Sequence, residues 1–184
     1  MIDSARAAGD LDPDRMAALL ASGRPGTRPL AAAYAASDKR AESAGETILR
    51  RFHEVMEIAV QPQAALRDGS GDVFGRADLL LSGRRDVHEY DGAGHRAALQ
   101  HRSDLRRDRR LAQASYTRRG FTLDDLVNHA GVTMHELDRV LGREHRRARL
   151  VRWRRMIEGS MFSETGRQRV LNRWRRAMGV VDWS

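Results

Sequence analysis

A short loop between two strand-like segments is the feature that most constrains how this chain can fold. Residues 76–81 read RADLLL, residues 86–91 read DVHEYD, and the four residues SGRR lie between them. Short apolar segments joined by a loop of this length are typical of a β-hairpin. If Leu81 pairs with Asp86, the numbers of paired residues sum to 167, and a shift by one residue would turn every side chain to the other face. The register is therefore a specific geometric prediction.

This register brings acidic side chains together. Asp78 is placed directly opposite Glu89, and Asp91 shares their face because side chains alternate along a strand. His88 and Tyr90 are expected to point away, with His88 in packing or at the surface. Carboxylates gathered without lysine partners repel one another, which raises their pKa values. A divalent cation would relieve that repulsion.

The chain has no cysteine, so a metal would have to be held by carboxylate, imidazole or carbonyl groups, which favours Mg²⁺ or Mn²⁺. Mg²⁺ held by one or two carboxylates and several waters can stabilise charge that develops on a phosphodiester. The alternative needs no metal: Asp78 and Glu89 pair with arginines, and Asp91 merely begins a turn. The arginines nearest in sequence are Arg76, Arg84 and Arg85.

The other periodic segments predict a small sheet covered by helices. Ser43 and Glu46 have the spacing of a capping box, and apolar residues then recur at helical spacing, which predicts a helix over 44–59. Glu46 thus has a structural explanation as well as a functional one. Further strands are predicted at 58–66, 73–82 and 116–122, and a long polar helix at about 96–114. The expected fold class is α/β (α+β): a small mixed sheet flanked by helices, with a basic helical C-terminal tail.

Breaker residues and charge divide the chain into three parts. Residues 1–38 combine a short helical piece that opens at Pro13 with the breaker-rich GRPGTRPL, and are expected to be a leader or linker remnant. Residues 39–145 hold the predicted sheet and are expected to form the domain with the core. Residues 146–184 are expected to form a basic helical tail.

The formal net charge of +8 and the sequence pI of about 11.1 are those of a polyanion binder, most simply a nucleic-acid binder. The alternative is an arginine-rich composition, since Lys39 is the only lysine. Trp153 and Trp174 each stand beside an arginine pair, and are expected to cover the core rather than to stack on bases. No apolar run is long enough to span a bilayer and no signal-peptide core opens the chain, so we expect a cytoplasmic protein without a membrane partner.

Three stretches carry a resemblance to a known family: GRADLLL (75–81), HEYDGAGH (88–95) and DLRRDRRLAQASYTRRGFTLDDLV (104–127). In this order they resemble the very-short-patch-repair-like (Vsr-like) endonuclease domains of the PD-(D/E)XK restriction-endonuclease-like superfamily. There, a helix carrying a glutamate precedes a strand ending in an acidic residue, an E-x-D-G-x-x-H strand, a basic helix and a final strand. The resemblance runs from about residue 40 to 142. Relatives often follow a winged helix in actinobacterial AbiEi-like type IV antitoxin proteins, so a shortened relative is expected here.

The resemblance implies a metal-dependent endonuclease that cleaves DNA with Mg²⁺ or Mn²⁺. It implies Asp78 and Glu89 as metal ligands and Glu46 as an accessory acid. It also implies His95 as a proton carrier or phosphate contact, although from the sequence His95 could equally cap the next helix. Asp91 stands where many superfamily nucleases have a lysine, so the attacking water would have to be activated by His95 or by the metal.

Two further features bear on this interpretation. Asp86 and His88 put polar residues into a strand that the family usually fills with apolar ones, so that strand is either an exposed edge or part of a site that has drifted. Arginines at helical spacing follow, and either contact nucleic-acid phosphates or form a solvated stripe balanced by Asp104 and Asp108. These arginines are Arg102, Arg106, Arg107, Arg109 and Arg110.

Residues 122–141 resemble the helix-turn-helix of bacterial repressors and give the runner-up function, a non-catalytic DNA-binding regulator. In that interpretation HAGV, residues 129–132, is the turn and Thr133 caps the second helix. Glu136 and Asp138 argue against it, because they put negative charge near phosphates. An antitoxin-like module with a degenerate nuclease fold is a further alternative. One acidic cluster per chain would require a homodimer, or two sequential nicks, to cut both strands.

Overall fold

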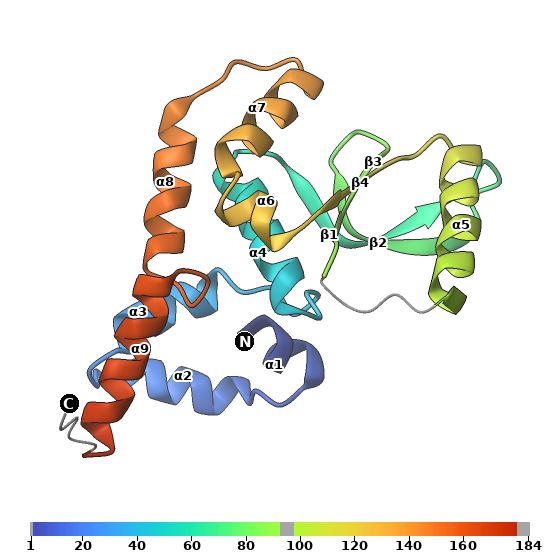
Figure 1. The fold of residues 1–184 in the computed structure, drawn as a ribbon. Coiled ribbons are helices and arrows are strands. Elements are labelled where there is room, and N and C mark those ends of the chain that lie inside the picture. Colours follow the sequence, from blue (N-terminus) through green and yellow to red (C-terminus); the bar gives the residue numbers. More distant parts are fainter. Residues whose placement is uncertain (1, 93–97, 180–184) are drawn as a thin grey trace. The chain divides into compact units, whose positions relative to one another are not determined.

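The computed structural model describes residues 2–92 and 98–179, with the backbone alone for residues 98–104 and 177. Its elements follow one another as helices, a sheet and more helices (Figure 1). They are α1 (Ile2–Ala8), α2 (Pro13–Ala21), α3 (Thr27–Ala35), α4 (Ala44–Val55), β1 (Val60–Arg67), β2 (Val73–Leu81), β3 (Asp86–Tyr90), α5 (Ala98–Gln113), β4 (Thr117–Phe121), α6 (Leu123–Val127), α7 (Ala130–Val140), α8 (Arg147–Glu158) and α9 (Glu164–Ala177).

The four strands form one mixed sheet in the order β1-β2-β3-β4. β1 and β2 are antiparallel, as are β2 and β3, whereas β4 is parallel to β3. A parallel neighbour requires a crossover connection, and α5 lies in that connection between β3 and β4. This confirms the predicted fold class of a small mixed sheet flanked by helices.

The predicted hairpin register is correct. Leu79 pairs with His88 and Leu80 pairs with Val87, so the numbers of each pair sum to 167 as expected. Register is strongly specified here because both faces of β3 are buried and a slip of one residue would exchange them.

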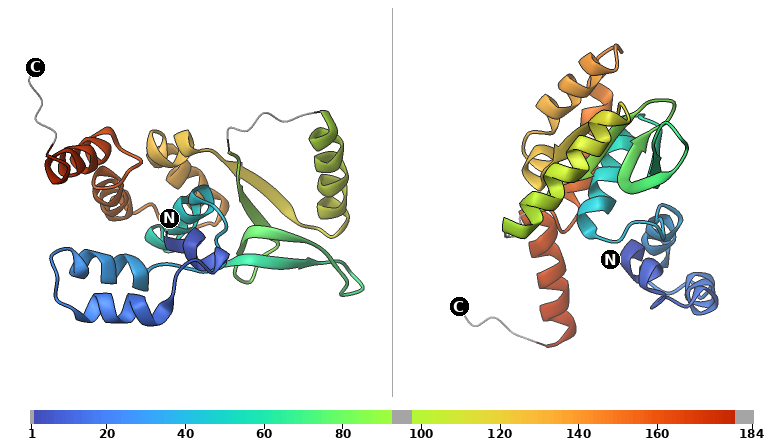
Figure 2. Two further views of the ribbon diagram at one scale, coloured as in Figure 1. Left: turned by 90° about the horizontal axis from the view of Figure 1, so that it is seen from below. Right: turned by 90° about the vertical axis from the view of Figure 1, so that its right-hand side faces the viewer.

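Consecutive residues of β3 contact different helices. His88 contacts His53 of α4, whereas Val87 belongs to an apolar cluster with Leu111 of α5. The ribbon views likewise place α4 and α5 on opposite sides of β3 (Figures 1 and 2). Of the two explanations expected for the polar residue His88, an exposed edge is wrong, because β3 is an inner strand and His88 is 5 % exposed.

The buried histidine is accommodated by a second one. His53 Nδ1 lies 2.8 Å from the carbonyl oxygen of Leu49, so Nδ1 carries the proton and donates it. His53 Nε2 is then an acceptor, and it lies 2.7 Å from His88 Nδ1. Burial, followed by the positive charge of nearby groups beginning with His53, lowers the pKa of His88 to about 2. His88 is therefore neutral, and the two rings together satisfy a polar position in the core.

The first helix is attached to the central part of the chain by a buried ion pair. Asp3 in α1 is 3 % exposed, and its Oδ2 lies 2.8 Å from a guanidinium nitrogen of Arg50 in α4. The hydroxyl of Thr47 donates to the same carboxylate oxygen over 3.0 Å. Further along, Asp12 caps α2, whose first residue is Pro13 as the sequence predicted.

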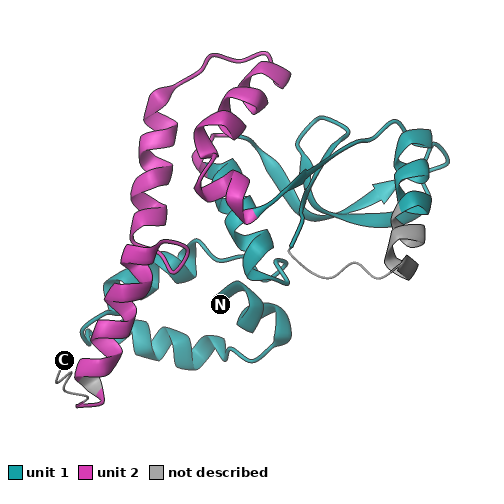
Figure 3. Ribbon diagram, in the orientation of Figure 1, with its two compact units in different colours: residues 1–54, 58–122 teal, residues 55–57, 123–184 magenta. Residues whose placement is uncertain are grey.

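The chain divides into two compact units, residues 1–54 with 58–122 and residues 55–57 with 123–184 (Figure 3). The first holds the sheet, and the second holds α6 to α9. None of the described helices is long and apolar enough to cross a bilayer. The domain boundaries expected from the sequence stay a prediction.

The second unit corrects the expected helix-turn-helix geometry. Residues 130–132 of the supposed turn lie inside α7, which begins at Ala130 after the N-cap His129. Thr133 is buried, and its hydroxyl donates to the carbonyl oxygens of Asp125 and His129, so it does not cap a helix. The prediction failed because a threonine can bond back to the preceding turn of its own helix as readily as it caps one.

Candidate active site

Asp78 stands where β2 and β3 stop pairing through their backbones. Its Oδ2 accepts a hydrogen bond of 2.9 Å from the backbone N–H of Tyr90, the place that a strand carbonyl would otherwise take. The Tyr90 ring in turn lies against Gly45 of α4, where a Cβ would be 2.1 Å from ring carbons. Tyr90 therefore faces α4, and its backbone N–H is held by Asp78.

The carboxyl group of Asp78 is strongly perturbed. Burial raises its pKa to about 6, the Tyr90 N–H lowers it in part, and the negative charges of Glu46 and Glu89 raise it further. Arg107 offsets this only weakly, as the smallest of these influences. Glu46 and Glu89, two carboxylates that the sequence singled out, thus raise the pKa of a third, Asp78.

Glu89 faces α5, on the side of β3 away from His88 as the alternation predicted, but it is not free of partners. Its Oε1 accepts from Arg107 of α5, and its Oε2 lies 2.5 Å from Nε of Arg118 in β4. The residue is 7 % exposed, so both arginines compensate a buried charge. The alternative in which Glu89 pairs with arginines is thus realised, but with other arginines than those expected. Arg76 pairs with Glu42, and Arg84 pairs with Asp86.

Asp91 joins the same cluster through Arg118. Its Oδ1 lies 3.6 Å from a guanidinium nitrogen of Arg118, which also pairs with Asp108 over 3.3 Å. The backbone N–H of Asp91 donates to the carbonyl oxygen of Phe121 over 2.8 Å, which extends the pairing of β3 with β4 beyond Tyr90. Gly120 makes room for the side chain, because a Cβ there would lie 1.8 Å from Oδ2 of Asp91.

Glu46 has the structural role at the start of α4 that the sequence suggested. As predicted for the capping box, its backbone N–H donates to Oγ of Ser43 over 3.0 Å. Its carboxylate accepts from the N–H of Glu42 over 2.9 Å, one residue before the position that the capping box predicts. The same carboxylate oxygen accepts from Nε2 of Gln63 over 2.7 Å, and its charge acts on Asp78.

Gln63 and Arg118 are site residues that the sequence did not reveal. Gln63 falls in β1 between residues paired with the two neighbours of Asp78, and its φ of 52° is unusual for a residue other than glycine. Nothing in the sequence indicates that conformation. Arg118 could have been suspected, because a parallel β4 beside β3 brings position 118 next to the acidic strand.

Other predicted residues stand as follows. His95 lies outside the described residues, and for Arg102 only the backbone position in α5 is described. Of the remaining predicted arginines, Arg106, Arg107 and Arg110 line an open hollow of about 360 Å³, and Arg109 does not.

The two tryptophans of the C-terminal tail differ in exposure. Trp153 is 1 % exposed and donates from Nε1 to the carbonyl oxygen of Leu126, as expected for the core, whereas Trp174 is 59 % exposed.

Hard cations fit the donor chemistry of this cluster but not a closed cage. No group of three or more described histidines, aspartates or glutamates is arranged to hold a metal ion. Mg²⁺ commonly uses only one or two carboxylates and completes its coordination with water and substrate phosphate. Asp78 and Glu89 could provide those two if Glu89 exchanged an arginine for the cation.

A comparison of this chain with models of protein families, with curated proteins and with solved structures gives no match.

Proposed function

We propose that the protein is a divalent-cation-dependent endonuclease that acts on phosphodiester bonds of DNA. The observation that carries the proposal is the pair of Asp78 and Glu89, which come next along the hairpin after the last paired residues, Leu79 and His88, with the pKa of Asp78 raised to about 6 by burial and by the charges of Glu46 and Glu89. A carboxylate whose pKa is raised in this way, and which forms no ion pair with any of the described residues, is more readily explained by function than by stability. The order of α4, β2, β3, α5 and β4 supports it, because the resemblance implies the same order.

Each part of the cluster has a role in this mechanism. Asp78 and Glu89 would hold Mg²⁺ or Mn²⁺, which when bound supplies a Lewis acid for the phosphate and an acidified water. Arg107 and Arg118 hold Glu89 in place, and their guanidinium groups can contact phosphate oxygens once the cation takes over Glu89. Burial is the main cause of the raised pKa of Asp78, and the charge of Glu46 raises it further. Glu46 also accepts a hydrogen bond from Gln63.

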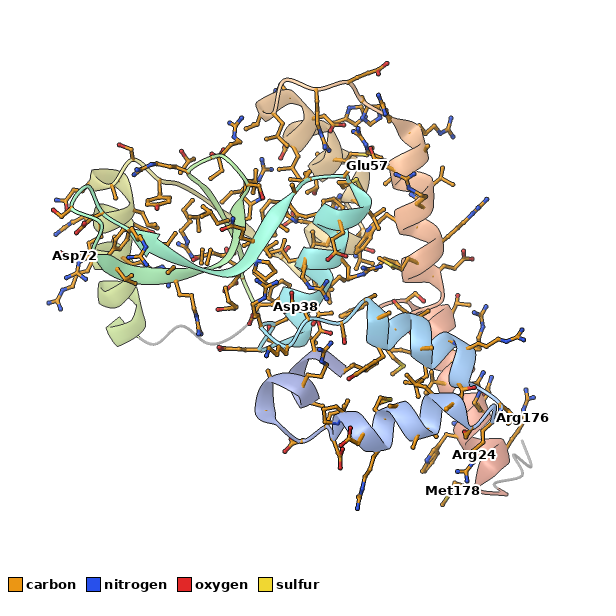
Figure 4. The ribbon with its side chains drawn as sticks, turned by 180° about the vertical axis from the view of Figure 1, so that it is seen from behind. Arg24, Asp38, Glu57, Asp72, Arg176 and Met178 are labelled. Carbon is orange, nitrogen blue, oxygen red and sulfur yellow. The ribbon has the colours of Figure 1, made fainter. Side chains whose placement is uncertain are left out.

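The test is conversion of supercoiled plasmid with Mg²⁺ or Mn²⁺. Asp78→Asn and Glu89→Gln should lose at least about 100-fold in nicking rate, because each removes a charge that holds the cation. The matched control is Asp72→Asn, which makes the same change in the exposed turn between β1 and β2 (Figure 4). Nicking should also fall as the pH drops below about 6, where Asp78 gains a proton. Nicking that survives in both variants would overturn the proposal.

The second candidate is a DNA-binding protein that has the fold without the chemistry. Its supporting observation is Glu89, whose two oxygens are already occupied by arginines. DNA binding that persists in EDTA and in Asp78→Asn, with no nicking even in Mn²⁺, would favour this candidate. An antitoxin-like module would belong to the same class. Under the endonuclease proposal a homodimer, or two successive nicks, would be needed to cut a duplex.

A further inference from the structure

Two open hollows lie side by side along α5. The first, of about 360 Å³, is lined by Leu66 of β1, by Phe74 and Gly75 of β2, and by three arginines of α5. The second, of about 350 Å³, lies at the turn between β1 and β2 and shares Phe74 and Arg110 with the first. Each is of the size that small ligands occupy in proteins, about 300–1,000 Å³. Shared walls make them one groove, which we call the α5 groove.

The α5 groove combines positive charge with an aromatic ring. Among the described residues, no carboxylate pairs with Arg106 or Arg110, and neither is buried. Phe74 is partly buried and held edge-on against Tyr116, with ring centroids 6.0 Å apart. Exposed Val73 extends the apolar floor into the second hollow. Exposed guanidinium groups beside a fixed aromatic ring are the combination that binds a nucleic-acid backbone and its bases together.

The groove leads directly to the acidic cluster. Arg107 lines the first hollow and donates both to the backbone carbonyl of Arg76 and to the carboxylate of Glu89. A strand whose phosphates follow Arg110 and Arg106 would therefore reach Arg107, and with it the carboxylate that it holds.

We propose that the α5 groove binds a single strand of nucleic acid, with an unstacked base against Phe74 and phosphates on Arg106 and Arg110. This rests on the proposed function and names its substrate class as single-stranded or locally unpaired DNA. In an intact duplex every base is stacked and paired, so none could enter a hollow of this size beside Phe74 without being extruded first. A single strand meets no such cost.

Gly75 offers a way to fill the groove without disturbing the fold. A Cβ at Gly75 would meet only Cδ1 of Leu66, at 3.9 Å, an ordinary van der Waals contact. Gly75 lies within β2, where valine is favoured over glycine. Gly75→Val should therefore fold with unchanged or higher thermal stability and yet reduce the space for a base.

The experiment measures fluorescence anisotropy of labelled single-stranded and duplex DNA of the same sequence, in EDTA so that no cleavage occurs. The wild-type protein should bind the single strand at least about tenfold more tightly than the duplex. Gly75→Val and Phe74→Ala should each weaken single-strand binding by about tenfold or more. Arg106→Ala and Arg110→Ala should each reduce the slope of log affinity against log salt by about one, and Arg109→Ala, the same change on the same helix outside the groove, by clearly less.

The outcomes separate this inference from the proposed function. Equal affinity for both DNAs, or full single-strand binding by a folded Gly75→Val protein, would overturn the inference even if metal-dependent nicking is found. Groove-dependent binding of the single strand without nicking would leave the inference in place and overturn the endonuclease. Binding of single-stranded RNA of the same sequence is measured as well. Tighter binding of RNA than of DNA would support the groove as a single-strand site but overturn DNA as its substrate.

Discussion

Asp78 and Asp138 are both acidic residues removed from water, but their surroundings differ. Asp138 in α7 is 2 % exposed, and its carboxylate oxygens lie 2.6 Å from Nε of Arg143 and 3.3 Å from a guanidinium nitrogen of Arg149. His145 is a third neighbour. Asp78 has one backbone N–H, two acidic neighbours and only a weak influence from Arg107.

The difference separates a carboxylate whose charge the fold compensates from one for which we propose a chemical role. A buried carboxylate supports the fold when cations and hydrogen bonds replace its lost hydration, and it destabilises the fold when they do not. At Asp138 two arginines compensate the buried charge, and Arg149 also pairs with Glu57, which follows α4 (Figure 4). At Asp78 the arginines serve Glu89 instead, so the site keeps an acidic position that a bound cation could complete.

The largest effect is expected when the structural network is broken. Asp138→Ala should lower the free energy of unfolding by about 3–5 kcal/mol, because Arg149, 6 % exposed, would lose its nearest buried counter-charge. Urea denaturation followed by the fluorescence of the buried Trp153 measures it. Glu164→Ala, which removes an exposed partner of Arg167, should lower the free energy of unfolding far less.

If Asp138→Ala does not fold, the conservative Asp138→Asn takes its place. It retains an acceptor for Arg143 and should lose less stability than the alanine variant while still losing more than Glu164→Ala. Equal and small losses for Asp138→Ala and Glu164→Ala would show that the buried network contributes no more than a surface pair.

The buried histidine pair provides an intermediate effect. The pKa of His88 is lowered in the folded protein, so the unfolded chain binds the proton that the folded chain excludes. The stability that the neutral His88 contributes is therefore fully present above about pH 6.5 and is lost as the pH falls toward 2. Between pH 7 and pH 4.5 the loss should reach about 2–3 kcal/mol, measured as hydrogen exchange of the β3 amides.

His88→Leu removes the ionisable ring and should reduce this pH dependence of β3 exchange. His129→Gln, at a histidine whose side chain is 60 % exposed, is the control and should leave the dependence in β3 unchanged. A His88→Leu protein that loses protection at pH 4.5 as steeply as the wild type would exclude His88 as the origin of the effect.

Sequence reasoning succeeded where contacts are local. The hairpin register followed from a four-residue loop, and the capping box at Ser43 and Glu46 followed from a spacing of three residues. It failed where partners come from distant positions. His88 was expected to point away from the acids, and it does, but its partner His53 lies 35 residues earlier. The arginine that holds Glu89 from β4 lies 29 residues later, so neighbours in sequence were wrongly preferred.

The smallest effect on stability is expected at Asp78, and its sign tells whether the fold requires this carboxylate. Because the pKa of Asp78 is raised in the folded protein, its protonated form favours folding below about pH 4, and that advantage is lost as the pH rises through about 6. At pH 8 the ionised carboxylate destabilises the folded protein. Asp78→Asn, which can still accept from the Tyr90 N–H, should then be more stable than the wild type by about 1 kcal/mol, after allowance for partial exposure. At pH 4 the two proteins should unfold alike.

Urea denaturation at both pH values, without divalent cations, measures this difference, and Asp72→Asn in the exposed turn should show none. A saturating concentration of Mn²⁺ should stabilise the wild type and not Asp78→Asn, which reverses their order. A variant that is less stable than the wild type at pH 8 would place Asp78 with Asp138, as a carboxylate that the fold requires. A variant that is more stable and inactive would show that the fold tolerates Asp78 for its chemistry.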